Sequence, residues 1–571
     1  MSTHARPLAD WLAAASDDDL RRLLAARGVR PDAAWQDFFD AAESLLDPSS
    51  LARVLPTLTA SEARALLEAA AGGSAGREQE ALTALALLRP DGTPYPPVTA
   101  AISGRTTPDA APVRTTPPPS SSETAAAHAA ERAFTTVAVL ADLLLIARER
   151  PFTLLTGGTV SAGEKRQLAD SGVPVEVVDT LVAIATQAGL AVAADRRLRS
   201  SQSAEDWLRS SAVERWSVLA TSFRDAVPRG IRSPDGGWTS PARWADAHPW
   251  DPTWTDRART LHEAARLLGL IAEDGTEPEW AAGLRRGESP DAGTLARLLP
   301  AEVDRIFLQN DLTAIAPGPL EPALDVRLRT IAARESAAQA SSYRFTSESV
   351  AHAFVAGETE QSILDFLGAL SLTGIPQPLG YLIAQTAQRH GLVRVSTDEE
   401  TGRTRIESSD AHLIDAMAVD QSLRPLALTA HVASLTTRVG RDTVYWALTD
   451  ARYPATLVGA DGALLIRERH PAPPAEPLDD SSDDLAPLIA RLRARQGPDA
   501  DAAWLDRELE AAVRAKSVLQ VTVGMPDGST RQLLLEATGM GGGRLRGRDR
   551  AADVERTLPV SSILAATVVA P

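Results

Sequence analysis

The chain has 571 residues, 44% of them hydrophobic, which supplies apolar mass for several cores at about 100–200 residues a domain. It contains no cysteine, which excludes disulfides and cysteine-ligated zinc and fits a cytoplasmic protein. The net charge of −17 argues against a protein that coats DNA through a broad basic surface, and no apolar run reaches the about 18 residues that a membrane span needs.

Residues 1–90 have the pattern of a helical domain. Leu20 and Leu24 lie one helical turn apart, as the apolar side of a buried helix requires. Ser16 precedes three aspartates and Thr59 precedes Glu62 by three residues, and both arrangements are typical helix N-caps. The sequence therefore predicts a small all-α domain at this end of the chain.

Two proline-rich stretches indicate linkers. Prolines recur with serine and threonine through residues 91–124, a composition that does not build a core, so we expect disorder there. Residues 471–487 combine prolines with a run of aspartates. They are predicted to separate the central part of the chain from a C-terminal module.

Residues 128–200 show the element order of a winged helix. A long helix over about 128–149 is followed by a short extended piece and a second helix, which Ser161 and Glu164 open as a capping box. After a turn, a third helix precedes a hairpin, the wing. This order of helix, helix, turn, helix and hairpin is typical of the helix-turn-helix class.

Residues 203–300 are predicted to be mostly helical and hold seven of the 11 tryptophans. Exposed tryptophans stack on nucleic-acid bases, but such platforms usually interleave aromatic with basic residues. Here proline and aspartate are the usual neighbours. We therefore favour the interpretation that these tryptophans anchor helix packing. They are Trp207, Trp216, Trp238, Trp244, Trp250, Trp254 and Trp280.

Residues 304–466 carry the most informative motif. An apolar strand leads into the polar residues Gln309, Asp311 and Thr313, then into a second apolar run and Pro317-Gly-Pro. This stretch resembles the helicase-associated domain at the N-terminus of XPB-type DNA helicases. The resemblance implies an α+β fold and a bacterial protein that works beside nucleic acid or a helicase. The polar residues are expected to bond local backbone where the strand ends, with a partner or DNA contact as the alternative.

Residues 505–571 open with a helix and continue as alternating strands with glycine-rich turns. The helix, the Asp527-Gly turn and the closing Arg556-Thr-Leu are similar to the WYL domain, which implies a small SH3-like β-barrel. The Trp-Tyr-Leu signature itself is absent, because Arg544-Leu stands where it would fall.

Candidate DNA contacts come from two groups of basic side chains, since wings and helix N-termini commonly reach phosphates. In the winged-helix-like part these are Lys165, Arg166, Arg196, Arg197 and Arg199. In the C-terminal module they are Arg544, Arg546 and Arg548, which alternate and therefore share one face of a strand. A solvated basic face is the alternative in both places.

The sequence carries no catalytic signature. Neither lysine, Lys165 or Lys516, follows a glycine, so no Gly-Lys-Ser/Thr loop exists to hold nucleotide phosphates. The nine histidines are scattered without the spacing of a metal site. We predict no enzyme activity, no metal and no cofactor.

Together these patterns predict a multi-domain, mainly α protein with α+β modules. The favoured function is a non-catalytic, helicase-associated DNA-binding or adaptor protein in DNA repair or genome maintenance, with DNA or a separate helicase chain as partner and no membrane. The alternatives are a WYL-type winged-helix transcription regulator and a protein–protein scaffold that does not touch DNA. The oligomeric state is left open by the sequence.

Overall fold

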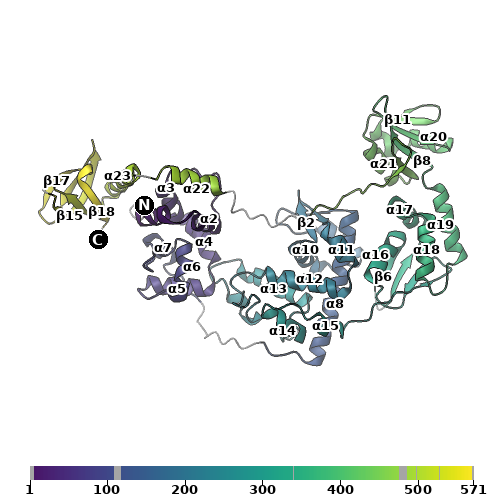
Figure 1. Cartoon of the computed structure of the whole chain (residues 1–571), viewed down its shortest axis with the longest axis horizontal. Coiled ribbons are helices and arrows are strands. Elements are labelled where there is room, and N and C mark those ends of the chain that lie inside the picture. The colour runs from purple at the N-terminus through teal and green to yellow at the C-terminus, as the bar shows by residue number, and fades with distance from the viewer. Residues whose placement is uncertain are drawn as a thin grey trace.

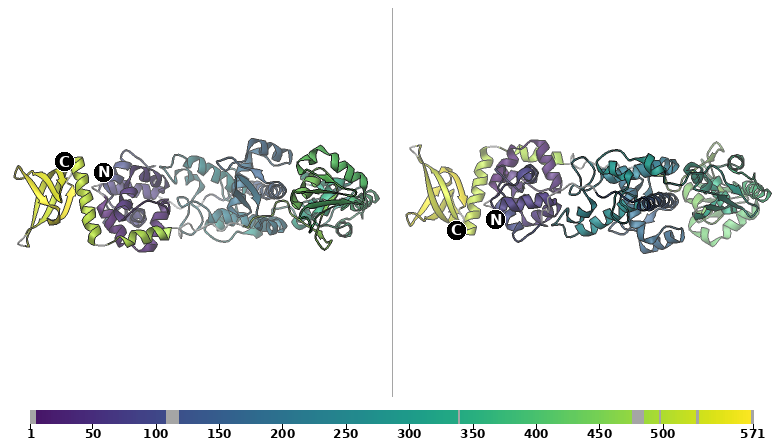
Figure 2. Two further views of the ribbon diagram at one scale, coloured as in Figure 1. Left: turned by 90° about the horizontal axis from the view of Figure 1, so that it is seen from above. Right: turned by 90° about the horizontal axis from the view of Figure 1, so that it is seen from below.

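The computed structural model describes residues 5–107, 118–337, 340–474, 485–496, 498–525 and 528–568. Within these ranges the buried apolar side chains gather in five separate cores. Figures 1 and 2 show the modules strung along an elongated molecule, with the yellow C-terminal sheet at one end and the green modules at the other. The architecture is a mixed α/β, multi-domain chain with several sheets.

The N-terminal core is helical, as predicted. Ser16 accepts a hydrogen bond from the Asp19 amide, and Thr59 and Glu62 form the full reciprocal capping box. The helices of this part are α1 (Arg6–Ala14), α2 (Asp17–Ala26), α3 (Phe38–Leu46), α4 (Pro48–Val54), α5 (Ala60–Ala70), α6 (Gln79–Ala84) and α7 (Pro96–Ile102).

The predicted disorder of residues 91–124 is wrong for much of that range. The prolines at the start of α7 occupy the first helical positions, where the missing N–H is not needed. Tyr95, Val98 and Ile102 are buried in the N-terminal core, so this segment belongs to the domain. Residues 108–117 lie outside the described residues, and α8 (Glu123–Glu149) already begins within the predicted linker.

The N-terminal core is completed by the other end of the chain. Helix α22 (Ala486–Ala494) places Leu488, Ile489 and Leu492 in it, and Trp504 on α23 (Pro498–Ala515) follows. The predicted boundary between a 471–487 linker and a separate C-terminal module is therefore wrong at its far end, although residues 475–484 lie outside the described residues. Sequence spacing gave no sign of this contact, because the two segments are more than 450 residues apart.

The predicted modules 128–200 and 203–300 share one core. It runs from Ala129 on α8 to Leu295, joins both halves continuously and also includes Val326 from the following module. Its elements after α8 are β1 (Phe152–Thr153), α9 (Ala162–Asp170), α10 (Val178–Gln187), β2 (Ala191–Ala194), β3 (Arg197–Ser200), α11 (Ser203–Arg209), α12 (Ala212–Asp225), α13 (Trp254–Leu267), α14 (Glu279–Arg285) and α15 (Ala292–Ala296).

The seven tryptophans of residues 203–300 are all buried, with at most 8% of each side chain exposed. The indole N–H groups of six of them donate to backbone carbonyls. Trp216 donates to the Leu268 carbonyl at 2.8 Å and Trp254 to the Trp244 carbonyl at 2.7 Å. The packing interpretation is confirmed, and these rings are not available for base stacking.

The predicted block 304–466 divides into two cores. The first packs α16 (Pro322–Ile331), α17 (Ser347–Val355), α18 (Glu360–Leu370) and α19 (Gln377–Arg389) with a sheet of order β4-β5-β7-β6. The strands are β4 (Phe307–Leu308), β5 (Thr313–Ala316), β6 (Ala333–Ala337) and β7 (Ser341–Arg344). The second core starts at β8 (Val393–Thr397), whose sheet shares no strand with the first among the described residues.

The second sheet has the order β10-β11-β9-β8-β12-β13, and β12 runs parallel to β8. Its other strands are β9 (Thr404–Ser408), β10 (Thr429–Ala430), β11 (Ser434–Thr437), β12 (Ala455–Val458) and β13 (Leu464–Leu465). Helices α20 (Ala411–Val419) and α21 (Arg441–Asp450) complete this module.

The C-terminal module is an open antiparallel sheet, which corrects the prediction of a closed SH3-like barrel. The order is β17-β16-β15-β14-β18, and no pairing of β17 with β18 joins the edges in the described residues. The apolar face is covered by Leu505, Leu509 and Ala512 of α23, so the sheet buries that face without closing on itself. The strands are β14 (Val518–Gly524), β15 (Thr530–Gly541), β16 (Arg544–Asp549), β17 (Val554–Pro559) and β18 (Ile563–Val568).

Candidate nucleic-acid interface

Helix α9 carries two of the predicted contacts, but one of them is neutralised. Lys165 Nζ lies 2.5 Å from Asp179 Oδ2, and the same carboxylate accepts the Val160 amide. Arg166 is exposed and its Nε donates to the Ala162 carbonyl one turn earlier. Asp179, 14 residues further along the chain, thus neutralises most of the positive charge that Lys165 would offer to a phosphate.

In the predicted winged helix, helix α10 would take the place of the helix that enters the major groove in helix-turn-helix domains. Its sequence contains no lysine or arginine, and Thr180, Leu181 and Val182 are buried. At its end, Gln187 exchanges hydrogen bonds with Ser222 of α12. This helix is occupied with packing and presents little that reads base edges.

The hairpin of β2 and β3 is the best-formed basic feature of the central module. Its tip, Asp195-Arg196, has left-handed backbone with φ of 51° and 57°. Arg196 and Arg197 are exposed and Arg199 is half-buried. Among the described residues no carboxylate pairs with any of these three arginines, so their charge is free to meet an anion.

The β16 arginines alternate outward as predicted, with Leu545 between them buried. Arg548 lies opposite Glu536 and Glu555 and forms an ion pair of 2.7 Å with Asp553. Arg544 and Arg546 face no carboxylate across the strands. Two of the three C-terminal candidates therefore keep an unbalanced charge.

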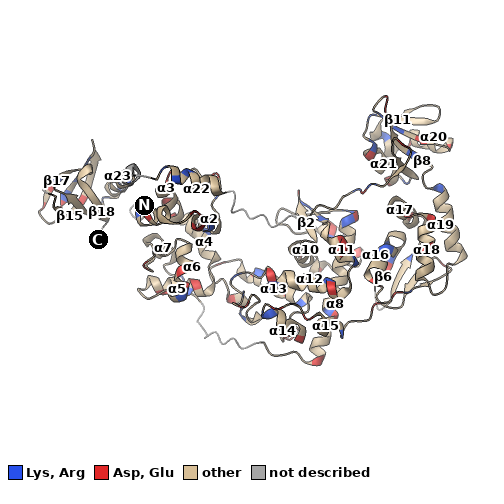
Figure 3. Ribbon diagram, in the orientation of Figure 1, with Lys and Arg blue, Asp and Glu red and all other residues tan. Residues whose placement is uncertain are grey.

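The two groups of arginines do not form one surface. The β2–β3 hairpin lies in the middle of the elongated molecule and β16 at its yellow end (Figures 1 and 2). Figure 3 shows basic and acidic residues interspersed along the chain instead of collected on one side. Any nucleic-acid contact is thus local and small in the number of phosphates it neutralises.

Gln309, Asp311 and Thr313 shape the turn between β4 and β5. The Thr313 hydroxyl lies 2.5 Å from Asp311 Oδ1 and 3.0 Å from Gln309 Oε1, and the Thr313 amide donates to Asp311. This network accompanies a left-handed backbone at Leu312, with φ of +67°, a conformation that residues other than glycine seldom adopt. The structural interpretation of the motif is what these contacts support.

Replacing Thr313 with valine removes the hydroxyl from this network and is expected to lower the free energy of unfolding by about 1–2 kcal/mol. The hydrogen bond from Thr313 lowers the pKa of Asp311, so the variant should also move that pKa back up. Carboxyl NMR and urea denaturation measure the two effects. Thr99→Val, on an exposed position of α7, is the control and should stay within about 0.5 kcal/mol.

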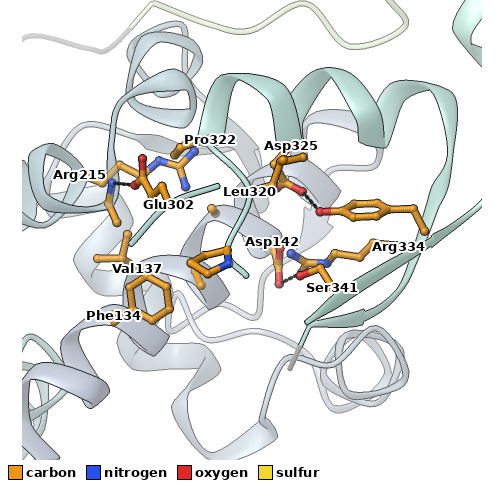
Figure 4. A pocket seen from close by; sticks show the side chains of 15 residues that line it. Phe134, Val137, Asp142, Arg215, Glu302, Leu320, Pro322, Asp325, Arg334 and Ser341 are labelled. Carbon is orange, nitrogen blue, oxygen red and sulfur yellow. Dashed lines mark hydrogen bonds and ion pairs between the residues drawn. The ribbon is translucent and has the colours of Figure 1, made fainter. Parts of the chain in front are cut away.

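A charged joint links α8 to the module that follows it. Asp142 on α8 accepts hydrogen bonds from Arg329 of α16, at 2.7 Å, and from Arg334 of β6. Figure 4 shows Asp142 pointing toward Arg334 at the edge of a cavity of about 120 Å³. Close by, the Tyr343 hydroxyl donates to Asp325 at 2.6 Å. Sequence reasoning missed this network because its members are almost 200 residues apart.

A second buried cation lines the same cavity. Arg215 on α12 donates to the Trp207 carbonyl at 3.0 Å, and burial lowers its pKa to about 10. Glu302, which also lines the cavity, accepts the Ala212 amide at 2.9 Å. The charged side chains named in this joint all have partners within the chain, which favours a structural joint over a ligand site.

A family model described as the helicase conserved C-terminal domain matches residues 306–431. The match lies inside the predicted block 304–466 and supports a helicase-related role for it. It covers the first of the two cores and part of the second. The XPB-type and WYL-type likenesses stay predictions. No curated protein matches the chain.

Membrane-spanning helices and clusters of metal ligands are both absent from the described residues. Among the described residues, no helix is both long enough and apolar enough to span a bilayer. Within the described ranges, no group of three or more histidine, aspartate or glutamate side chains is arranged to hold a metal ion. The predicted lack of a cofactor is left as a prediction.

Proposed function

We propose that this chain is a non-catalytic, helicase-associated adaptor that holds a helicase chain near nucleic acid, in DNA repair or genome maintenance. The match of residues 306–431 to the helicase conserved C-terminal domain is the observation that carries the proposal. In this proposal the block 304–466 corresponds to the XPB-type helicase-associated domain. The absence of a Gly-Lys-Ser/Thr loop from the sequence supports a partner that supplies the motor.

The charge of the matched region favours a protein as its direct partner. Residues 306–431 contain 9 basic and 15 acidic side chains, a net charge of −6. Such a surface repels phosphates, whereas proteins that track nucleic acid present basic surfaces. We therefore assign the helicase contact to this block.

Nucleic acid is assigned to the central module. Its order α8, β1, α9, α10, β2, β3 and its sheet order β1-β3-β2 support a winged helix. The arginines of the β2–β3 hairpin would contact the backbone, while α10 contributes no cation. A sequence-reading transcription regulator receives less support, because base readout needs polar side chains directed outward from that helix.

The double variant Arg196→Ala, Arg197→Ala tests the nucleic-acid contact. Removing two phosphate contacts should reduce the salt dependence of duplex binding by about 2 in the slope of log K against log salt. Gel-shift titrations over a range of salt measure that slope. Arg21→Ala, Arg22→Ala is the charge-matched control, because both arginines pair with Asp18 and Asp19 on α2. A wild-type protein that binds no duplex, forked or single-stranded DNA would favour a scaffold that does not touch DNA.

The non-catalytic part of the proposal has its own test. The purified chain should show no ATP turnover above buffer, with or without DNA. Robust turnover that a point substitution within this chain abolishes would contradict it.

A further inference from the structure

The segment that follows β13 leads back to the central module, where it passes the β2–β3 hairpin. The Gln202 amide, just beyond β3, donates to the Pro473 carbonyl at 3.0 Å. Figure 1 shows this segment leaving the green six-stranded module and reaching β2. It thereby brings His470 to the basic hairpin from a region more than 250 residues away in sequence.

Two arginines of β3 lie near this crossing, and no carboxylate among the described residues pairs with either of them. Arg197 and Arg199 are two residues apart, so both project from the same side of the strand. The Nε of Arg199 is buried and has no hydrogen-bond partner in the part of the chain that the structure describes. A buried donor without a partner is uncommon, and an anion is the natural acceptor for a guanidinium.

The charges of these arginines act on the imidazole of His470. Burial lowers the pKa of its imidazole, and three nearby guanidinium groups lower it further. They are those of Arg469, on its own segment, and of Arg199 and Arg197 on β3. Arg469 is held elsewhere by two bonds to Asp450, of 2.7 and 2.8 Å, and lies over the Trp446 ring. The two β3 arginines and the half-buried imidazole are left to share a ligand.

We propose that Arg197, Arg199 and His470 together bind a phosphate group, and that the phosphodiester backbone of nucleic acid supplies it. This deepens the proposed function and rests on it for the source of the phosphate. A guanidinium fork matches two phosphate oxygens, and a protonated imidazole adds a third donor. The returning segment therefore converts a basic hairpin into a three-sided anion site.

The site has a predictable pH dependence. A bound phosphate offsets the repulsion from the arginines, so the pKa of His470 is higher in the complex than in the free protein. Binding then takes up a proton, is strongest below the free-state pKa and weakens as pH rises through the higher value of the complex. A change of one pKa unit corresponds to at most about a tenfold change in affinity.

Fluorescence anisotropy with a short oligothymidylate tests this in the full chain, since a phosphodiester keeps its charge between pH about 6 and about 8. The wild type should bind about 3- to 10-fold more tightly at the lower pH. His470→Gln should abolish that difference, and His412→Gln, an exposed histidine on α20, should keep it. Arg199→Ala should weaken binding at both pH values. An unchanged pH dependence in His470→Gln overturns the proposal.

Two further arms identify the ligand. Dimethyl phosphate, followed by the NMR shift of the His470 imidazole, reports the anion site without a polymer. A shift with dimethyl phosphate but no binding of the oligonucleotide supports the anion site and contradicts nucleic acid as its source. Equal binding of polyglutamate overturns the assignment to phosphate. If Arg196→Ala, Arg197→Ala weakens DNA binding while His470→Gln changes nothing, the proposed function stands and this inference fails.

Discussion

Replacing Trp504 with alanine is expected to lower the free energy of unfolding of the N-terminal helical module by about 3–5 kcal/mol, although Trp504 lies more than 400 residues beyond that module. The indole is 3% exposed, its ring centroid is 6.3 Å from that of Phe39, and its Nε1 donates to Asp37 at 3.1 Å. Asp37 also caps α3 by accepting the Phe39 and Asp40 amides. The substitution removes core volume and a partner of the capping carboxylate together.

Hydrogen exchange resolved by segment is the suitable measurement, because 11 tryptophans make bulk fluorescence ambiguous. Amides of α1 and α3 should lose protection in Trp504→Ala. Trp446→Ala is the matched control: that ring packs at the edge of a different core, so residues 5–102 should keep wild-type protection. Unchanged protection of α1 and α3 in Trp504→Ala would show that the C-terminal helices do not complete this core.

Replacing Asp142 with alanine is expected to have the second large effect. It should destabilise the joint between α8 and the module that contains residues 306–431 by about 3–5 kcal/mol. The substitution leaves Arg329 and Arg334, with side chains only 16% and 15% exposed, without their shared carboxylate. Uncompensated buried charge is more costly than a lost surface ion pair. We expect the joint to open before either core unfolds.

Limited proteolysis and hydrogen exchange of α16 and β6 measure the opening. Glu273→Ala is the control, because Glu273 is 73% exposed and its contacts to Arg132 and Arg266 are both 3.4 Å long. It should change stability by less than about 1 kcal/mol. Equal protection of α16 in Asp142→Ala and wild type would mean that the ion-pair network does not hold the joint.

Local chemistry explains what the sequence predicted well. Ser16 and Thr59 stand beside the amides they cap, so a few residues decide those helix starts. The interpretation of the tryptophans of residues 203–300 as packing anchors agrees with their burial, although Arg215 and Arg243 directly precede two of them. The Asp311–Thr313 turn is likewise complete within five residues. The alternation of the β16 arginines follows from strand geometry alone.

Contacts between distant segments explain what the sequence did not predict. Nothing near Tyr95 or Leu488 indicates that both enter one core, so the linkers and domain boundaries were misplaced. The spacing of Lys165 does not reveal that Asp179 neutralises it. The sequence position of His470 gives no sign that its segment lies beside β3 in the folded chain. The closed barrel failed because α23, and not sheet closure, covers the apolar face.

The most direct test of the helicase-associated role is site-specific photo-cross-linking of the full chain in its native cell. Tyr381 is 67% exposed within the matched residues and accepts a photoreactive phenylalanine analogue without loss of a buried contact. Leu564, 58% exposed on the C-terminal sheet, is the control position. We predict that Tyr381, and not Leu564, cross-links to a chain that carries an ATP-dependent helicase motor. Cross-links from Tyr381 that reach only proteins without a nucleotide-binding loop would contradict the account.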